Sequence, residues 1–149
     1  MEKKRLSKIL ARADREIVAG LSADIQKKHS VTVIKEPGKT LAMIKMREPV
    51  RRSLFYLGEV IVCEAVVELN GVKGMAVTMG DDTDKTLDMA IVDAAVNGGI
   101  FTGIETLLAL EKRQQEKIMR ENALHMKTMV NFESMDGEVP SDVAAFKKA

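Results

Sequence analysis

Residues 57–79 contain two β-branched, hydrophobic runs that are joined by Asn70-Gly71. This dipeptide is the strongest short signal for a two-residue hairpin loop, because both residues tolerate the left-handed backbone of a type I′ turn. A loop of fixed length also fixes the register of the strands on either side of it. The pairs that we expect to face each other are Leu69–Val72, Glu68–Lys73, Val66–Met75 and Glu64–Val77.

The two faces of this ribbon differ in the size of their side chains. One face is small, with Ala65 opposite Ala76 and Val67 opposite Gly74, so a helix can approach it closely. The other face surrounds Glu64 with large apolar residues, namely Val60, Val62, Val66, Met75, Val77 and Met79. A sheet that is apolar on both faces needs more than one covering layer.

Two ways of covering this second face remain open. The N-terminal helices of the chain could lie on it, with Glu64 paired internally. Alternatively, another subunit could complete it, with Glu64 at the edge of the interface. In the second case we expect the partner of Glu64 to be one of the nearby cations, Lys45, Arg47, Arg51 or Arg52.

The remaining segments predict an α+β fold. Apolar residues recur every three or four positions over 2–28, which indicates two short helices, with Asp14 as a cap for the second. Pro37-Gly38 lies between two further strand-like runs and predicts a hairpin turn in which Gly38 takes a positive φ. With the Asn70-Gly71 ribbon, this gives an antiparallel sheet of about four strands in two hairpins.

Two further helices are predicted after the sheet, and both should pack on it. Asp81 or Asp82 can cap the first of them, and Gly98-Gly99 ends it. The second helical region runs from about 100 to 132, and the middle of its apolar stripe is polar, which is typical of a helix that projects from the body or bridges to a neighbour. We therefore expect one domain over 1–149, with N-terminal helices at 1–30, the sheet at 31–79, C-terminal helices at 82–132 and a flexible tail at 133–149.

Composition excludes several classes of function. The 149 residues carry a formal net charge of +1, which provides no field to attract DNA or an anionic membrane. The single cysteine, Cys63, excludes an internal disulfide. The sequence contains no signal-peptide core and no apolar run long enough to span a membrane, so a cytoplasmic location is expected.

No self-contained active site emerges from the spacing of the polar residues. Asp82 and Asp84 are spaced like the start of a calcium loop, but the later ligands of that motif are missing. Glu59 and Glu64 fall on opposite faces of a regular strand, which argues against an acid–base pair. We therefore predict no catalytic residue, no metal site and no cofactor bound by this chain.

The order of several motifs resembles the PhnG family, the G subunit of the bacterial carbon–phosphorus lyase system. The likeness spans roughly residues 5–136. Its most specific parts are LGEV-x-V-x-EA at Leu57 to Ala65, G-x-D at Gly80 to Asp82 and A-x-x-DA at Ala90 to Ala94. Asp81 stands where many relatives have a basic residue, which argues against anion binding at that turn.

The resemblance implies a core complex with H, I and J subunits, assisted by an ATP-binding L subunit. Such a complex uses ATP as a substrate: methylphosphonate displaces adenine, giving α-D-ribose 1-methylphosphonate 5-triphosphate. On this reading the chain is a scaffold, not the catalytic subunit. Its candidate interface or structural residues are Glu59, Glu64, Met75, Val77, Met79, Asp82, Met119 and Met126. The alternative is a homo-oligomeric small-ligand or regulatory binding module, which would form a homodimer when isolated.

Overall fold

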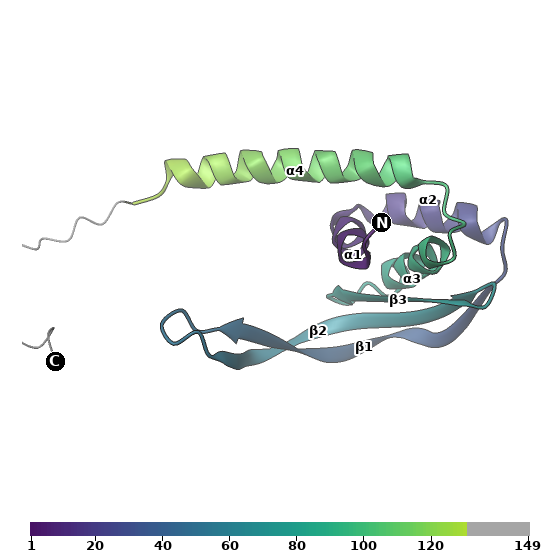
Figure 1. Ribbon diagram of the computed structural model, residues 1–149, viewed down its shortest axis with the longest axis horizontal. Helices are drawn as coiled ribbons and strands as arrows, with labels where there is room; N and C mark the ends of the chain where they lie inside the picture. The colour runs from purple at the N-terminus through teal and green to yellow at the C-terminus, as the bar shows by residue number, and fades with distance from the viewer. Residues whose placement is uncertain (131–149) are drawn as a thin grey trace, which may run out of the picture. The chain divides into compact units, whose positions relative to one another are not determined.

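The computed structural model describes residues 1–130 and has the predicted α+β class (Figure 1). Its elements are α1 (Lys3–Arg12), α2 (Arg15–Gln26), β1 (Val31–Arg47), β2 (Leu54–Leu69), β3 (Val72–Met79), α3 (Thr83–Asn97) and α4 (Ile104–Lys127). The chain divides into two compact units, Met1–Gln115 and Glu116–Ala149. The expectation of one domain over 1–149 stays a prediction, and the predicted tail at 133–149 lies outside the described residues. Among residues 1–130, no helix is long and apolar enough to cross a membrane.

The sheet has three antiparallel strands in the order β1-β2-β3, so the prediction of about four strands is wrong. Residues 31–47 form one strand, and the φ angle of Gly38 is not positive. The pairing of β1 with β2 shifts between Lys35 and Gly38, which places Pro37 at an irregularity of an edge strand. Proline has no N–H to donate to a neighbouring strand, and an irregular position on an edge strand tolerates this because no such hydrogen bond is needed there.

The chain turns between β1 and β2 at residues 48–53 instead. The carboxylate of Glu48 accepts hydrogen bonds from the backbone N–H groups of Val50 and Arg51, at 2.8 and 2.6 Å. The Glu48 N–H donates to the carbonyl of Ser53 at an N···O distance of 2.9 Å. The φ angle of Arg52 in the same loop is 55°. One glutamate thus organises this loop.

The hairpin between β2 and β3 has the predicted register. Leu69 pairs with Val72, Glu68 with Lys73 and Glu64 with Val77. The φ angles of Asn70 and Gly71 are 50° and 80°, as a type I′ turn requires. The local turn chemistry therefore controls which side chains share a face of the sheet.

Helix α3 packs on the small face of the sheet, and α1 and α2 pack on α3 (Figure 1). The approach is closest at Gly74, where an added Cβ would overlap the Ala90 carbonyl oxygen and lie 2.6 Å from the Ala94 Cβ. The core between these layers consists of buried residues that include Leu6, Leu10, Val18, Val67, Leu69, Met89, Ile91 and Leu107.

The helix ends follow the predicted signals in most cases. The chain forms two N-terminal helices, but the side chain of Asp14 makes no capping hydrogen bond. Asp82 caps α3 by accepting from the Lys85 N–H at 3.0 Å. Gly98 and Gly99 end α3, and the positive φ of Gly99 lets the Ile100 N–H reach the Ala95 carbonyl at 3.0 Å.

Substituting Gly74 by alanine should destabilise the protein, because the new methyl group forces α3 away from the sheet. We expect a loss of about 1–3 kcal/mol in the free energy of unfolding, measured by denaturant titration. Gly20 is the matched control: it lies on an exposed position of α2 with no atom within 4 Å of an added Cβ. Gly20→Ala should stabilise the protein by about 0.5–1 kcal/mol. Equal effects of the two substitutions would contradict the close contact of α3 with β3.

Candidate functional site

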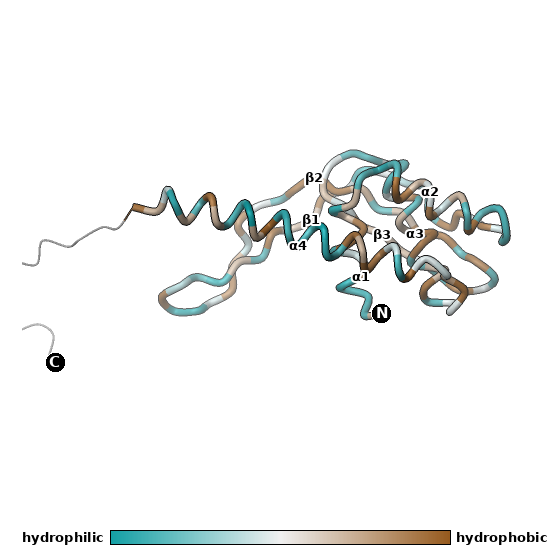
Figure 2. Tube along the Cα trace, turned by 90° about the horizontal axis from the view of Figure 1, so that it is seen from above, coloured by the Kyte–Doolittle hydropathy of each residue, from teal (hydrophilic) through white to brown (hydrophobic). Residues whose placement is uncertain are grey.

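The most distinctive surface lies on a two-stranded extension of the sheet. Strand β3 pairs only with Val62–Leu69 of β2, so the earlier part of β2 pairs with β1 alone. We call residues 40–61 the arm. Figures 1 and 2 both show the arm extending beyond α1, α2, α3 and β3.

Many large apolar side chains of the arm are exposed to solvent. Their exposed fractions lie between 43% and 61%, for Leu41, Met43, Met46, Leu54, Phe55, Tyr56, Leu57 and Ile61. Leu41 and Ile61 face each other across the arm, and so do Met46 and Phe55. The register shift between Ile44 and Lys45 leaves the extra residue, Leu57, on β2, so the side chains of β1 still alternate from position 41 to position 46. Positions 41 and 46 therefore fall on opposite faces, and both faces of the arm are apolar. Exposed apolar surface of this extent marks an interaction site.

The end of the arm is cationic. Lys45, Arg47, Arg51 and Arg52 lie there, and none of them takes part in an ion pair within the described part of the chain. The Lys45 ammonium lies 5.8 Å from the centre of the Tyr56 ring, and Arg47 donates to the Arg52 carbonyl at 2.8 Å. Figure 2 colours most of this end as hydrophilic.

The open face of the sheet, on the side away from α3, forms a second exposed surface. Met75, Val77 and Met79 are 54%, 47% and 77% exposed on β3, whereas Val62 is buried. Helices α1 and α2 lie on the α3 side, so the alternative in which they cover this face is wrong (Figure 1). Three of the candidate interface residues therefore share one accessible strip.

Glu64 lies on this open face and has a partner that the sequence did not predict. Its carboxylate forms an ion pair with the Lys35 ammonium of β1, not with Lys45, Arg47, Arg51 or Arg52. The register shifts in β1 place Lys35 opposite Val66, in the pair next to that of Glu64. The four predicted partners lie on the arm, farther along the sheet. The Glu64 side chain is 25% exposed, so this pair is partly shielded from water.

The other candidate residues are dispersed. Glu59 is exposed on the arm opposite Met43, and it falls on the other face of β2 from Glu64. Met119 and Met126, in the second unit, are 71% and 64% exposed. The described residues 1–130 contain no group of three or more His, Cys, Asp or Glu side chains arranged to hold a metal ion.

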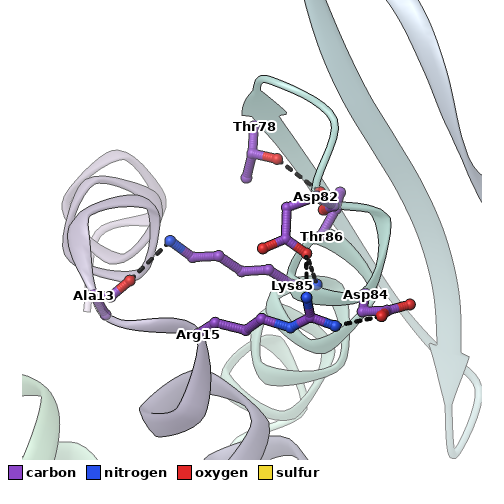
Figure 3. A network of polar contacts seen from close by, with 7 residues as sticks. All are labelled: Ala13, Arg15, Thr78, Asp82, Asp84, Lys85 and Thr86. Atoms are coloured by element: carbon purple, nitrogen blue, oxygen red, sulfur yellow. Dashed lines mark hydrogen bonds and ion pairs between the residues drawn. The ribbon is translucent and has the colours of Figure 1, made fainter.

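Asp82 belongs to a polar network that joins the N-terminal helices to the start of α3 (Figure 3). Besides capping α3, it lies 3.7 Å from Arg15, which also pairs with Asp84. The Lys85 ammonium donates to the carbonyls of Ala11 and Ala13 at 2.9 and 2.8 Å, where α1 ends. These groups satisfy each other, and the network is structural.

Two buried threonines complete this network. Thr86 donates its hydroxyl proton to the Asp82 carbonyl at 2.7 Å. Because that proton is used, Thr78 must be the donor in the 2.6 Å contact between the two hydroxyls. This chain of hydrogen bonds ties the end of β3 to the first turn of α3.

Asp93, in the A-x-x-DA segment, is a further structural carboxylate. It is 5% exposed and accepts from the Met75 N–H at 3.0 Å and from the Asn97 amide at 3.1 Å. The Lys3 ammonium lies 3.5 Å away. Asp93 thereby fixes edge strand β3 to α3, a role that the spacing of the sequence did not indicate.

A small pocket of about 290 Å³ lies between the end of α2 and the start of α4. Leu21, Ile25 and Phe101 form much of its wall, with Lys28 and His29 at its border. A ring nitrogen of His29 lies 3.2 Å from the Asn70 amide nitrogen, so this histidine is hydrogen-bonded within the fold.

The residues that sequence reasoning missed are the apolar residues of the arm. They were missed because Pro37-Gly38 was interpreted as a turn, which shortened the first strands. If 31–47 is interpreted as one strand, the first two strands are clearly longer than the third. Strands β1 and β2 have 17 and 16 residues, and β3 has 8. Such a mismatch predicts a part of the ribbon that β3 cannot reach.

The chain matches the model of the family described as phosphonate metabolism protein PhnG. The match covers residues 1–137, which include the arm, the open face and the Asp82 network. A search of curated proteins found no significant match.

The charge of Asp88 provides a pH-dependent test of packing between α2 and α3. Burial raises the pKa of this carboxyl, a hydrogen bond from Ser22 opposes the rise, and Asp84 adds to it. A pKa that is higher in the folded state means that stability is lost as the pH rises through that value. Asp88→Asn should therefore raise the free energy of unfolding at pH 7. This difference from the wild type should vanish below the pKa that the Asp88 carboxyl has in the unfolded chain. Denaturant titrations across this pH range measure the difference.

Asp24 provides the control, because its side chain is 73% exposed on α2. Asp24→Asn should give no gain in the free energy of unfolding at pH 7. A loss of stability in Asp88→Asn at neutral pH would show that the carboxylate is favourable where it lies.

Proposed function

Because the chain belongs to the PhnG family of phosphonate metabolism proteins, we propose that it is a subunit of the carbon–phosphorus lyase core complex. In this proposal it assembles with the H, I and J subunits, and the ATP-binding L subunit assists. The complex displaces adenine from ATP with methylphosphonate, which yields α-D-ribose 1-methylphosphonate 5-triphosphate. This chain contributes to that activity as a scaffold and not as the catalytic subunit.

The exposed apolar surface of the arm is the observation that carries the proposal. A two-stranded hairpin without a covering layer is only marginally stable in water. The arm has Leu41 and Ile61 on one face and Met46 and Phe55 on the other, all at least 43% exposed. A chain that works inside an assembly has such a surface covered by its partners.

Three carboxylates of the chain already take part in contacts that hold the fold together, which supports a scaffold role. Displacing a base from a ribose requires a carboxylate to stabilise an oxocarbenium-like state, together with cations for the phosphates. In this chain, Glu64 pairs with Lys35, Asp82 caps α3 and binds Arg15, and Asp93 holds Met75 and Asn97. These carboxylates maintain the fold, so the catalytic groups are assigned to other subunits.

A homo-oligomeric module that binds a small ligand is the second candidate. The observation in its favour is the pocket of about 290 Å³ beside Phe101. The two candidates differ in solution mass: the module pairs with itself, whereas the scaffold requires the other subunits.

Co-expression with the H, I and J subunits should yield one complex, detected by co-purification and by its mass in solution. The double variant Leu41→Ser/Ile61→Ser removes two facing side chains, which are 61% and 55% exposed. Full burial of a leucine or isoleucine contributes about 1.5–3 kcal/mol, and roughly half of each of these two side chains is still exposed in the isolated chain. Together they contribute about 1.5–3 kcal/mol to association, so we expect the variant to weaken it by about 10- to 100-fold.

Leu108→Ser is the matched control. Leu108 is 44% exposed on α4, outside the sheet, so its loss should leave association unchanged even if it lowers the free energy of unfolding. A wild-type chain that forms only a self-dimer, even in the presence of the other subunits, would contradict the proposal and favour the binding module.

A further inference from the structure

The arm combines apolar walls with a cationic end, and this pattern defines the surface that fits it. We propose that the arm inserts into a groove of a protein partner that has apolar walls and carboxylates where the arm ends. This inference rests on the proposed function, because the partner is taken to be another subunit of the same complex.

The groove must contact both faces of the arm. Leu41 with Ile61 and Met46 with Phe55 form facing pairs on opposite faces. All four side chains are 43% to 61% exposed, so a partner on one face alone would leave half of this apolar surface in water. Contact on both faces gives the arm the covering layers that a two-stranded ribbon lacks.

Carboxylates are the groups that match the end of the arm. Residues 45–56 contain four cations, Lys45, Arg47, Arg51 and Arg52, and one carboxylate, Glu48, which the backbone N–H groups of Val50 and Arg51 hold in the loop. The end of the arm therefore keeps a net positive charge that the loop does not balance. Burying these cations against a partner costs free energy unless opposite charges are provided.

A second copy of the chain does not provide these charges. The carboxylates of its turn at 81–84 already have cationic partners, because Asp82 and Asp84 pair with Arg15, and Asp81 lies 3.5 Å from Lys39. Two arms placed against each other would also bring like charges together. Charge complementarity therefore favours a different, acidic protein.

A membrane or a nucleic acid fits the arm less well. The charged loop lies at the tip of the arm, so Arg51 and Arg52 would enter the lipid first, before the apolar strands. Most of the exposed apolar side chains are aliphatic, including Leu41, Leu57 and Ile61, and these do not stack on bases.

The charge at the tip is tested with Arg51→Glu/Arg52→Glu. Affinity is measured between the purified chain and the co-expressed H, I and J subunits at low and at physiological salt. We expect the variant to bind at least tenfold more weakly and to lose most of the salt dependence of the wild type. Lys112→Glu/Arg113→Glu makes the same change of charge on exposed positions of α4 and should bind like the wild type.

The two-sided contact is tested on the second apolar pair. Met46→Ser/Phe55→Ser should weaken binding by at least tenfold, as should the pair on the opposite face, with the unfolding transition unchanged in each. Carbodiimide, which joins amines to carboxylates directly, should link Lys45 to an aspartate or glutamate of a partner subunit in the wild-type complex, as identified by mass spectrometry.

The outcomes separate the two proposals. A complex that forms equally well with the charge-reversal variant, or in which one apolar pair has no effect, overturns the groove and leaves the scaffold function standing. A wild-type chain that does not bind these subunits overturns both. Binding of the wild type, but not the reversal variant, to phosphatidylglycerol vesicles or to an oligonucleotide would also overturn the inference of an acidic protein partner.

Discussion

The close contact between α3 and the small face of the sheet is the constraint on which the rest of the structure depends. Gly74, Ala65 and Ala76 leave room for the helix backbone, and Asp93 fixes α3 to the Met75 N–H. The α1–α2 junction is then held to the start of α3 by Lys85 and Arg15. Because the helices that pack on the sheet gather on one side, its other face and the arm keep their apolar surface exposed.

This arrangement explains why a small chain carries so much apolar surface without losing a defined core. The core lies between the sheet and α1, α2 and α3, and its residues are almost fully buried. Most of the exposed apolar side chains of the sheet lie along residues 40–61 and on the outer face of β3, and α4 carries others, such as Met119 and Met126. The buried core and the exposed arm thus consist of different residues, so under the proposed function substitutions on the arm should change association without unfolding the chain.

The sequence predicted the parts of the fold that depend on local chemistry. Asn70-Gly71 determined the register of β2 and β3, and Asp82 and Gly99 marked the ends of α3 as expected. Pro37-Gly38 misled because the same dipeptide fits an irregular edge strand, a choice that only the pairing with β2 decides. The partner of Glu64 and the role of Asp93 also depend on contacts between strands and helices, which spacing along one chain does not contain.

Membership of the PhnG family places the chain in phosphonate metabolism, and the proposed scaffold function assigns the exposed arm to assembly. Hydrogen–deuterium exchange measures the central claim most directly, because backbone amides of an uncovered ribbon exchange quickly. The account predicts fast exchange at residues 40–47 and 54–61 in the isolated chain and strong protection after the H, I and J subunits bind. Equal exchange of these amides in the free and the assembled chain would contradict it.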